Sequence, residues 1–244
     1  MPRFFVNKDA ISDGFITITG EDAFHIARAL RMAVGDAITV SDGDGVDFAC
    51  ELTRIRDSEC ECRVLSSSVS ALEPPVAVTL YMAYPKGDKL EMVVQKAVEL
   101  GAVRVVPFES SRCIKKPNAE KTDKKTERLS RIAREAAGQC GRARLTEVLP
   151  PHTFQEMIES AKKAELALVC YENEDGLTIK DALTENAGVK SIALVVGSEG
   201  GFSPDEIARC LSAGIKSVSL GKRILRCETA PLFALSAISY GLEL

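Results

Sequence analysis

The chain is poor in histidine and has no tryptophan. Its only two histidines are His25 and His152, so a histidine metal site is not expected. Its eight cysteines include no C-x-x-C pair and no other metal-ligand spacing. We therefore expect buried thiols in a reducing compartment, and no bound metal.

Long apolar runs and common nucleotide motifs are also missing. No run approaches the roughly 20 apolar residues that span a membrane, and the N-terminus has no signal peptide, so we expect a cytoplasmic protein without a membrane partner. Gly197–Gly201 is not G-x-G-x-x-G, and no Gly-Lys-Ser/Thr follows it. A dinucleotide site and a P-loop are both poorly supported.

Two glycine-bearing loops lie near the C-terminus, at 196–203 and 220–226. Each follows a segment expected to form a strand, 191–196 or 216–220, and leads towards a helix. In an α/β sheet, ligands bind in such loops at the carboxyl ends of strands. Ser203–Glu206 is typical of a capping box with proline at the first helical position. A tight turn without a ligand is the alternative for either loop alone.

The second loop is basic and precedes an apolar helix. Lys222, Arg223 and Arg226 supply three cations within it, and a helix from Glu228 to the C-terminus is predicted. This helix is apolar around much of its circumference, so it must be buried against the domain or a partner. We expect it to pair with a second copy, with Ile238 in the contact.

Together, Gly-Ser-Glu-Gly-Gly-Phe-Ser and Leu-Gly-Lys-Arg-Ile-Leu-Arg-Cys-Glu-Thr-Ala resemble motifs of the RsmE family of 16S ribosomal RNA uridine-N3 methyltransferases, in the SPOUT superfamily. Segments 86–101, 107–112 and 135–142 resemble its middle part, and 3–5 and 25–31 its PUA-like domain. Ser198 stands where the family often has proline, and Cys227 where it often has threonine.

This resemblance implies an α/β fold: a SPOUT domain with a parallel sheet and a deep trefoil knot, preceded by a small PUA-like β-barrel. Residue patterns agree with it. Strands are expected at 4–6, 15–18, 37–41, 46–53 and 59–66, and a helix near 21–30. Ser66–Ser68 begins a polar stretch leading to Pro74 and Pro75. We place the PUA-like domain at 1–72, the linker at 73–76 and the SPOUT domain at 77–244.

The resemblance further implies an S-adenosylmethionine-dependent homodimer that methylates uridine N3 in 16S ribosomal RNA, within the small ribosomal subunit or its precursor. Arg226 and Glu199 are the candidate catalytic residues. The candidate cofactor contacts are Gly197, Glu199, Gly200, Leu220, Gly221, Ile224, Leu225 and Ala230. A structural tie from Arg226 to Glu199 or Glu228 is the alternative for Arg226. Methylation of a ribose 2′-hydroxyl, or RNA binding without catalysis, are the alternative functions.

Charge distribution points to an RNA surface in the middle of the chain. The net charge is −4, but Lys and Arg outnumber Asp and Glu between 104 and 144, where Lys115, Lys116 and Lys121 add to a basic helix. A solvated helix face is the alternative. The candidate RNA-binding residues are Arg3, Arg28, Arg31, Lys86, Arg112, Lys124, Arg128, Arg131, Gln139 and Arg142.

Overall fold

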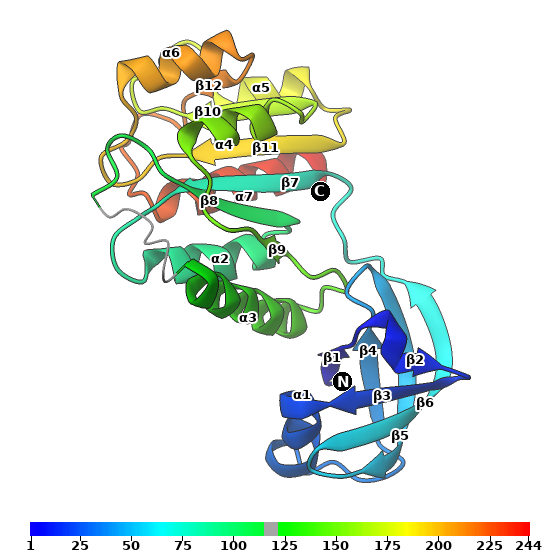
Figure 1. The fold of residues 1–244 in the computed structure, drawn as a ribbon. Coiled ribbons are helices and arrows are strands. Elements are labelled where there is room, and N and C mark those ends of the chain that lie inside the picture. The colour runs from blue at the N-terminus through cyan, green and yellow to red at the C-terminus, as the bar shows by residue number, and fades with distance from the viewer. Residues whose placement is uncertain (115–121) are drawn as a thin grey trace. The chain divides into compact units, whose positions relative to one another are not determined.

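The computed structural model describes residues 1–114 and 122–244, and the chain forms two compact units (Figure 1). The first unit contains residues 1–73 and 137–145, and the second contains 74–136 and 146–244. Helix α3 (Thr122–Cys140) contributes residues to both units. The first unit is therefore built from two separate stretches of chain.

A six-stranded sheet forms the first unit. Its strands lie in the order β1-β4-β5-β6-β3-β2, and only β1 and β4 pair in parallel. Alternating apolar residues, such as Ile16 and Ile18, point into its core and are fully buried. The bounds are β1 (Arg3–Phe5), β2 (Ile11–Ser12), β3 (Phe15–Thr19), β4 (Ala37–Ser41), β5 (Val46–Ile55) and β6 (Glu59–Val69).

Three local features of this unit refine the sequence predictions. The predicted helix near 21–30 consists of α1 (Gly20–Phe24) and a π-helical turn, η2 (His25–Ala29), and a 3-10 turn, η1 (Lys8–Ala10), precedes them. Asp42 Oδ1 accepts the backbone N–H groups of Asp44 and Val46, which closes the turn between β4 and β5. The polar stretch that begins at Ser66 starts inside the sheet, because Ser66–Ser68 continue β6 and pair with Asp47–Ala49.

The second unit confirms the predicted parallel α/β architecture. Its sheet has the order β12-β10-β11-β7-β8-β9, and every neighbouring pair is parallel. The central strands β10 and β11 are almost entirely apolar because helices cover both faces of the sheet. The bounds are β7 (Ala77–Ala83), β8 (Arg104–Phe108), β9 (Glu147–Val148), β10 (Leu166–Cys170), β11 (Ser191–Val196) and β12 (Lys216–Val218).

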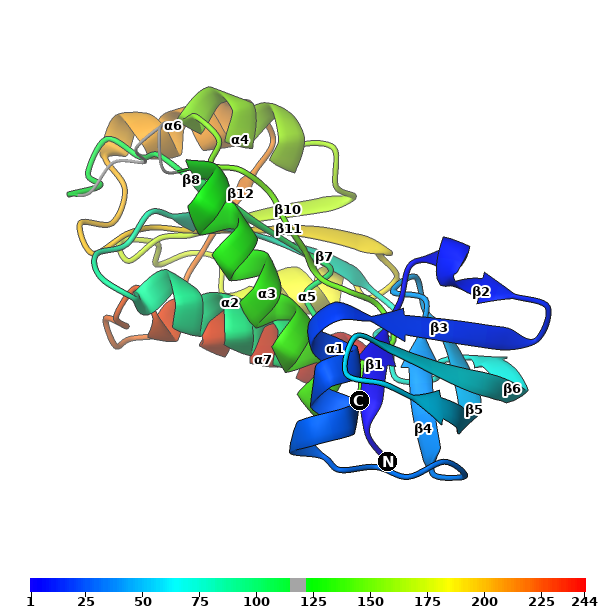
Figure 2. The same ribbon diagram turned by 60° about the horizontal axis from the view of Figure 1, so that its bottom comes forward.

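Helices α4 and α6 lie on one face of this sheet, and α2, α5 and α7 lie on the other (Figure 2). The predicted capping box of α6 is confirmed, because Ser203 and Glu206 exchange both hydrogen bonds. The Asp88 side chain, in contrast, does not cap α2. The bounds are α2 (Lys89–Glu99), α4 (Phe154–Ala161), α5 (Ile179–Glu185), α6 (Pro204–Ser212) and α7 (Thr229–Leu242).

The topology brings four loops to one edge of the parallel sheet. Strands β12, β10, β11 and β7 are successive neighbours, so the segments that leave their carboxyl ends lie side by side. Ligands of open α/β sheets bind at this edge. Among the described residues, none of the helices combines the length and the apolar composition needed to cross a bilayer. The trefoil knot stays a prediction from the resemblance.

Candidate active site

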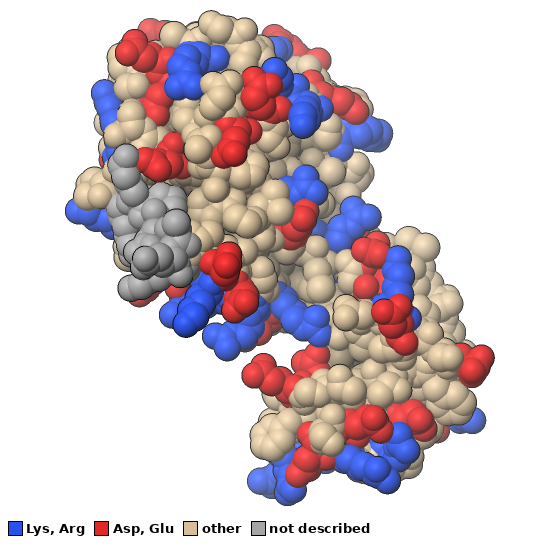
Figure 3. Space-filling view, in the orientation of Figure 1, with Lys and Arg blue, Asp and Glu red and all other residues tan. Residues whose placement is uncertain are grey.

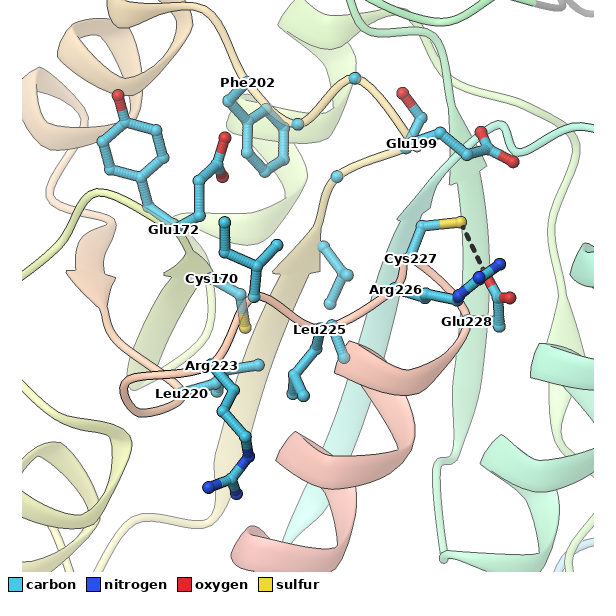
Figure 4. A pocket seen from close by; sticks show the side chains of 18 of the residues that line it. Cys170, Glu172, Glu199, Phe202, Leu220, Arg223, Leu225, Arg226, Cys227 and Glu228 are labelled. Carbon is cyan, nitrogen blue, oxygen red and sulfur yellow. Dashed lines mark hydrogen bonds between the residues drawn. The ribbon is translucent and has the colours of Figure 1, made fainter.

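A cavity of about 440 Å³ opens at this edge, between the loops that follow β10, β11 and β12 (Figure 4). Its size is that of a small-molecule site. The two glycine-bearing loops supply most of its wall. All residues predicted to contact a cofactor or to take part in catalysis line this one cavity: Gly197, Glu199, Gly200, Leu220, Gly221, Ile224, Leu225, Arg226 and Ala230.

Phe202 anchors the first loop to the domain. Its side chain is 1% exposed and stacks on Phe108 with ring centroids 6.3 Å apart, while Phe154 meets it edge-on. A side-chain carbon at Gly197 would lie 3.2 Å from the Phe202 ring, so the close packing of this ring requires glycine. Gly201 adopts a φ of +63°, a conformation that favours glycine.

Close packing, and not backbone conformation, explains glycine at position 200. The φ of Gly200 is not in the left-handed region. A side-chain carbon on it would lie 2.9 Å from Arg112 Cβ and 3.0 Å from the Arg112 carbonyl oxygen. The Arg112 guanidinium also donates to the Gly200 carbonyl at 3.2 Å. Gly200 therefore lets the segment after β8 lie against the first loop.

The second loop contributes apolar and basic side chains. Gly221 has a φ of +105° with open space around its Cα, so it serves the turn rather than a close contact. The Arg226 carbonyl accepts the N–H groups of Thr229 and Ala230, which turns the chain into α7. Leu220 and Leu225 are half-buried in the wall, whereas Ile224 is 87% exposed.

Lys89 joins the two loops at one rim of the cavity. Its Nζ atom lies 3.0 Å from Glu199 Oε1 and 3.1 Å from Glu228 Oε2, and 3.7 Å from Cys227 Sγ. These hydrogen bonds raise the pKa of Lys89 above its ordinary value. Burial and the hydrogen bond to Glu228 raise the pKa of the Cys227 thiol to about 12, so the thiol is protonated at neutral pH.

The Glu199 carboxylate is occupied by protein donors. Besides Lys89, the backbone N–H of Lys86 donates to it at 3.1 Å. Burial acts to raise the pKa of Glu199, but these backbone and Lys89 hydrogen bonds outweigh it, and the pKa lies below its ordinary value. Figure 4 shows this carboxylate directed away from the middle of the cavity. Glu199 is therefore held as an anion that braces the loop.

Arg226 does not form the structural tie that was its alternative role. Lys89, not Arg226, holds Glu199 and Glu228. In the described part of the chain, the exposed Arg226 guanidinium has neither a hydrogen bond nor an ion pair. It is free to meet a ligand charge.

Sequence reasoning missed several residues of this cavity. Lys89 follows β7, and Cys170, Tyr171 and Glu172 end or follow β10. The residues from Cys170 onward lie at the end of an apolar run of strand length, so the strand-end rule applied to this strand would have found them. Lys89 begins α2, beyond the loop that follows β7. Ser198, which stands where the family often has proline, is buried. Its Oγ lies 3.5 Å from the Arg112 carbonyl oxygen.

The predicted RNA-binding residues divide by exposure. Arg142 is 3% exposed, and its guanidinium donates to Glu73 at 2.8 Å. Arg3 is held by Asp47 and Ser41. These two side chains are structural, and their assignment to an RNA surface is not supported by their geometry. Those that are exposed are Arg28, Arg31, Lys86, Arg112, Lys124, Arg128, Arg131 and Gln139.

Basic side chains gather over α3 in Figure 3. Leu129, Ala133 and Ala136 form its buried side, as their helical spacing predicts. Of the exposed cations, Arg128 pairs with Glu91 at 2.7 Å. Lys115, Lys116 and Lys121 lie outside the described residues.

Comparison with known proteins identifies the family. Residues 72–239 match the RNA methyltransferase domain, and residues 18–65 match the RNA methyltransferase PUA domain. Ribosomal RNA small subunit methyltransferase E of Bacillus subtilis is 37% identical over 100% of this chain and 98% of its own length. The chain belongs to the ribosomal RNA small subunit methyltransferase E family.

Other members of the ribosomal RNA small subunit methyltransferase E family agree along the whole chain. The Mycobacterium tuberculosis protein is 32% identical over 96% of this chain and 90% of its own. The Neisseria gonorrhoeae protein was solved bound to S-adenosylmethionine, and it superposes with a TM-score of 0.87 at 29% identity, covering 99% and 98% of the two chains. A Legionella pneumophila methyltransferase with the same cofactor bound has a TM-score of 0.86 at 30% identity, covering 98% of this chain and 96% of its own.

Proposed function

We propose that this chain binds S-adenosylmethionine in the cavity and transfers its methyl group to N3 of a uridine in small-subunit ribosomal RNA. The observation that carries the proposal is the convergence of both family loops on one cavity lined by Arg226, a cation without a protein partner among the described residues. Membership in a ribosomal RNA methyltransferase family and the cofactor found in two structural relatives support it.

The residues present suit this cofactor. The cavity has an apolar floor that includes Cys170, Leu220 and Leu225 (Figure 4), which fits a flat adenine ring. Burial raises the pKa of the Cys170 thiol to about 12, so this wall remains uncharged. Backbone groups of the glycine loops line the polar part. When bound, the cofactor supplies a methyl group activated by a positively charged sulfur.

In this proposal, Arg226 stabilises the base. Uridine N3 becomes nucleophilic when it loses its proton, and the negative charge then spreads to the uracil oxygens. The planar guanidinium offers a fork of donors to such oxygens. The Cys227 thiol and the Lys89 ammonium are both protonated at neutral pH, so neither serves as the base, and the N3 proton leaves to solvent. Because N3 lies on the pairing edge, the target uridine must be unpaired or flipped out.

The proposed active form is a homodimer that pairs through α7. This helix contains no charged residue between 229 and 242, and Phe233 and Tyr240, seven residues apart on one side, are 42% and 78% exposed. An exposed apolar stripe is a reason for association, and a two-fold interface is the commonest form of it. Ile238 is 3% exposed within its own chain, so its assignment to the contact was wrong.

Identification of the methylated nucleoside tests the proposed function. Small ribosomal subunits from a strain lacking this gene are incubated with the purified chain and isotopically labelled S-adenosylmethionine, and the RNA is then digested for mass spectrometry. We expect label in 3-methyluridine. Label in a 2′-O-methylated nucleoside would overturn the assigned position. Absence of S-adenosylmethionine binding in calorimetry would overturn catalysis itself and favour an RNA-binding assembly role.

A further inference from the structure

Glu172 is the acidic residue of the cavity that has no cation beside it. Glu199 and Glu228 also line the cavity, and both form ion pairs with Lys89. Within residues 1–114 and 122–244, neither a hydrogen bond nor an ion pair reaches the Glu172 carboxylate. It follows β10 by two positions and lies at the rim on the side of Phe202, opposite Arg226 and Glu228 (Figure 4).

The first loop leaves space for this carboxylate. A side-chain carbon at Gly201 would lie 2.5 Å from Glu172 Oε1 and 3.1 Å from Oε2, so both oxygens lie directly against the Gly201 backbone. Any residue larger than glycine would displace them. The φ of +63° at Gly201 turns the Cα of this residue towards the carboxylate without steric cost. The position of Glu172 therefore depends on the glycine loop.

We infer that Glu172 binds the two hydroxyl groups of the cofactor ribose, an inference that rests on the proposed function. A carboxylate accepts two hydrogen bonds from vicinal hydroxyls, and the bonds are stronger because the acceptor is charged. With adenine on the apolar floor beside Cys170, the ribose joined directly to it lies next to the segment that leaves β10. Glu172 is in that segment.

The position of Arg226 separates the ribose from the other donor on the cofactor, its ammonium group. The methyl group must face the uracil, which Arg226 contacts in the proposed mechanism. The sulfur carries three groups: the methyl group, the amino-acid arm and the 5′-carbon of the ribose. Because adenine beside Cys170 directs the ribose towards the end of β10, the amino-acid arm extends from the sulfur on the Arg226 side of the cavity. Glu172 lies on the opposite side (Figure 4), where the ribose presents its pair of adjacent hydroxyl donors.

The experiment compares Glu172→Gln with Asp175→Asn, which removes an exposed carboxylate of the same loop that does not line the cavity. Affinities for S-adenosylhomocysteine and for 5′-methylthioadenosine, which lacks the amino-acid arm, are measured by calorimetry. We expect Glu172→Gln to weaken both ligands by the same factor, about 10- to 100-fold, and Asp175→Asn to change neither. Thermal melting verifies that both variants are folded.

A second comparison tests the hydroxyl contact itself. The 2′-deoxy form of 5′-methylthioadenosine should bind the unmodified protein more weakly than the parent ligand, whereas Glu172→Gln should hardly distinguish the two. Weakening of S-adenosylhomocysteine alone would place the ammonium at Glu172 and overturn the inference, as would equal losses in the two variants or no loss in Glu172→Gln. If the unmodified protein binds none of these ligands, the proposed function falls together with the inference.

Discussion

Arg226→Lys separates transition-state stabilisation from cofactor binding. The substitution keeps a positive charge in the cavity but replaces a planar fork of donors by a single point charge. In the described residues the guanidinium makes no hydrogen bond or ion pair that the change would break. We therefore expect the fold and the affinity for S-adenosylmethionine to remain close to those of the unmodified protein.

The expected effect falls on turnover. Loss of one donor aimed at a developing negative charge costs about 2.7–4 kcal/mol, or ~10²–10³ in kcat. Because lysine still supplies charge at this site, the lower part of that range applies, and we expect kcat to fall by about 10². The assay is single-turnover methyl transfer to ribosomal subunits at saturating cofactor, with cofactor affinity measured separately by calorimetry.

Arg223→Lys is the matched control for this prediction. Arg223 is three positions earlier in the same loop and is also exposed, but its side chain points away from Arg226 in Figure 4. It should retain nearly full turnover. Parallel losses of cofactor affinity and turnover in Arg226→Lys would refute the reasoning and assign Arg226 to the cofactor pocket. Equal losses in both variants would indicate a general effect of loop charge.

Three further predictions concern association, RNA binding and stability. Tyr240→Glu should shift the protein towards monomer in light scattering and lower methyl transfer in parallel. Ile238→Glu should instead unfold the protein, because Ile238 is buried within its own chain. An active Tyr240→Glu monomer would contradict the dimer proposal. The second variant replaces three exposed cations of α3 with Ala: Lys124, Arg128 and Arg131. It should lower the slope of log affinity for RNA against log salt concentration by up to ~0.9 per lost phosphate contact. An unchanged slope would mean that α3 is only a solvated face. Glu73→Gln should reduce the free energy of unfolding at pH 7 by about 1–3 kcal/mol, because the buried Arg142 guanidinium then donates to a neutral amide oxygen instead of a carboxylate. Burial acts to raise the pKa of Glu73, but hydrogen bonds from Arg142 and two backbone N–H groups lower it overall. The difference in free energy of unfolding between the two proteins, measured with urea at a series of pH values, should therefore be fully present above about pH 4.3. It should vanish as the pH falls through the pKa of Glu73 in the folded protein. A difference that persists in acid would contradict this assignment.

The sequence predicted those parts of the fold that depend on local patterns. Ser203 begins α6 as expected because the capping box is complete within four residues. The apolar run 191–196 is β11, residue for residue. Alternation predicted β3, where Ile16 and Ile18 face the core. The loops at 196–203 and 220–226 could also be predicted from the sequence, because each contains glycine and charged residues at the end of a strand.

What the sequence did not predict depends on contacts distant along the chain. Lys89 precedes Glu199 by more than a hundred residues, and no local pattern pairs them. The reason that Gly200 is a glycine is the backbone of Arg112, which arrives from another strand. In the sequence Arg142 resembles a surface cation in a basic stretch, but in the fold its side chain is buried and paired with the carboxylate of Glu73. In each case tertiary packing assigned a role that charge or glycine content alone left open.

The division of the first unit between two stretches of chain constrains the order in which the protein folds during synthesis. Glu73 accepts hydrogen bonds from the backbone of Ala143 and Arg144, and Leu145 donates to the Gly43 carbonyl. During synthesis, the strands of 1–73 emerge well before these partners, and residues 74–136 are translated in between. The strands of the N-terminal sheet all lie before residue 70 and can pair early, but these additional contacts form only after the end of α3 leaves the ribosome. For the same reason, a fragment that stops at residue 73 lacks part of its own unit, and a gene fusion that exchanges this unit must carry 137–145 with it.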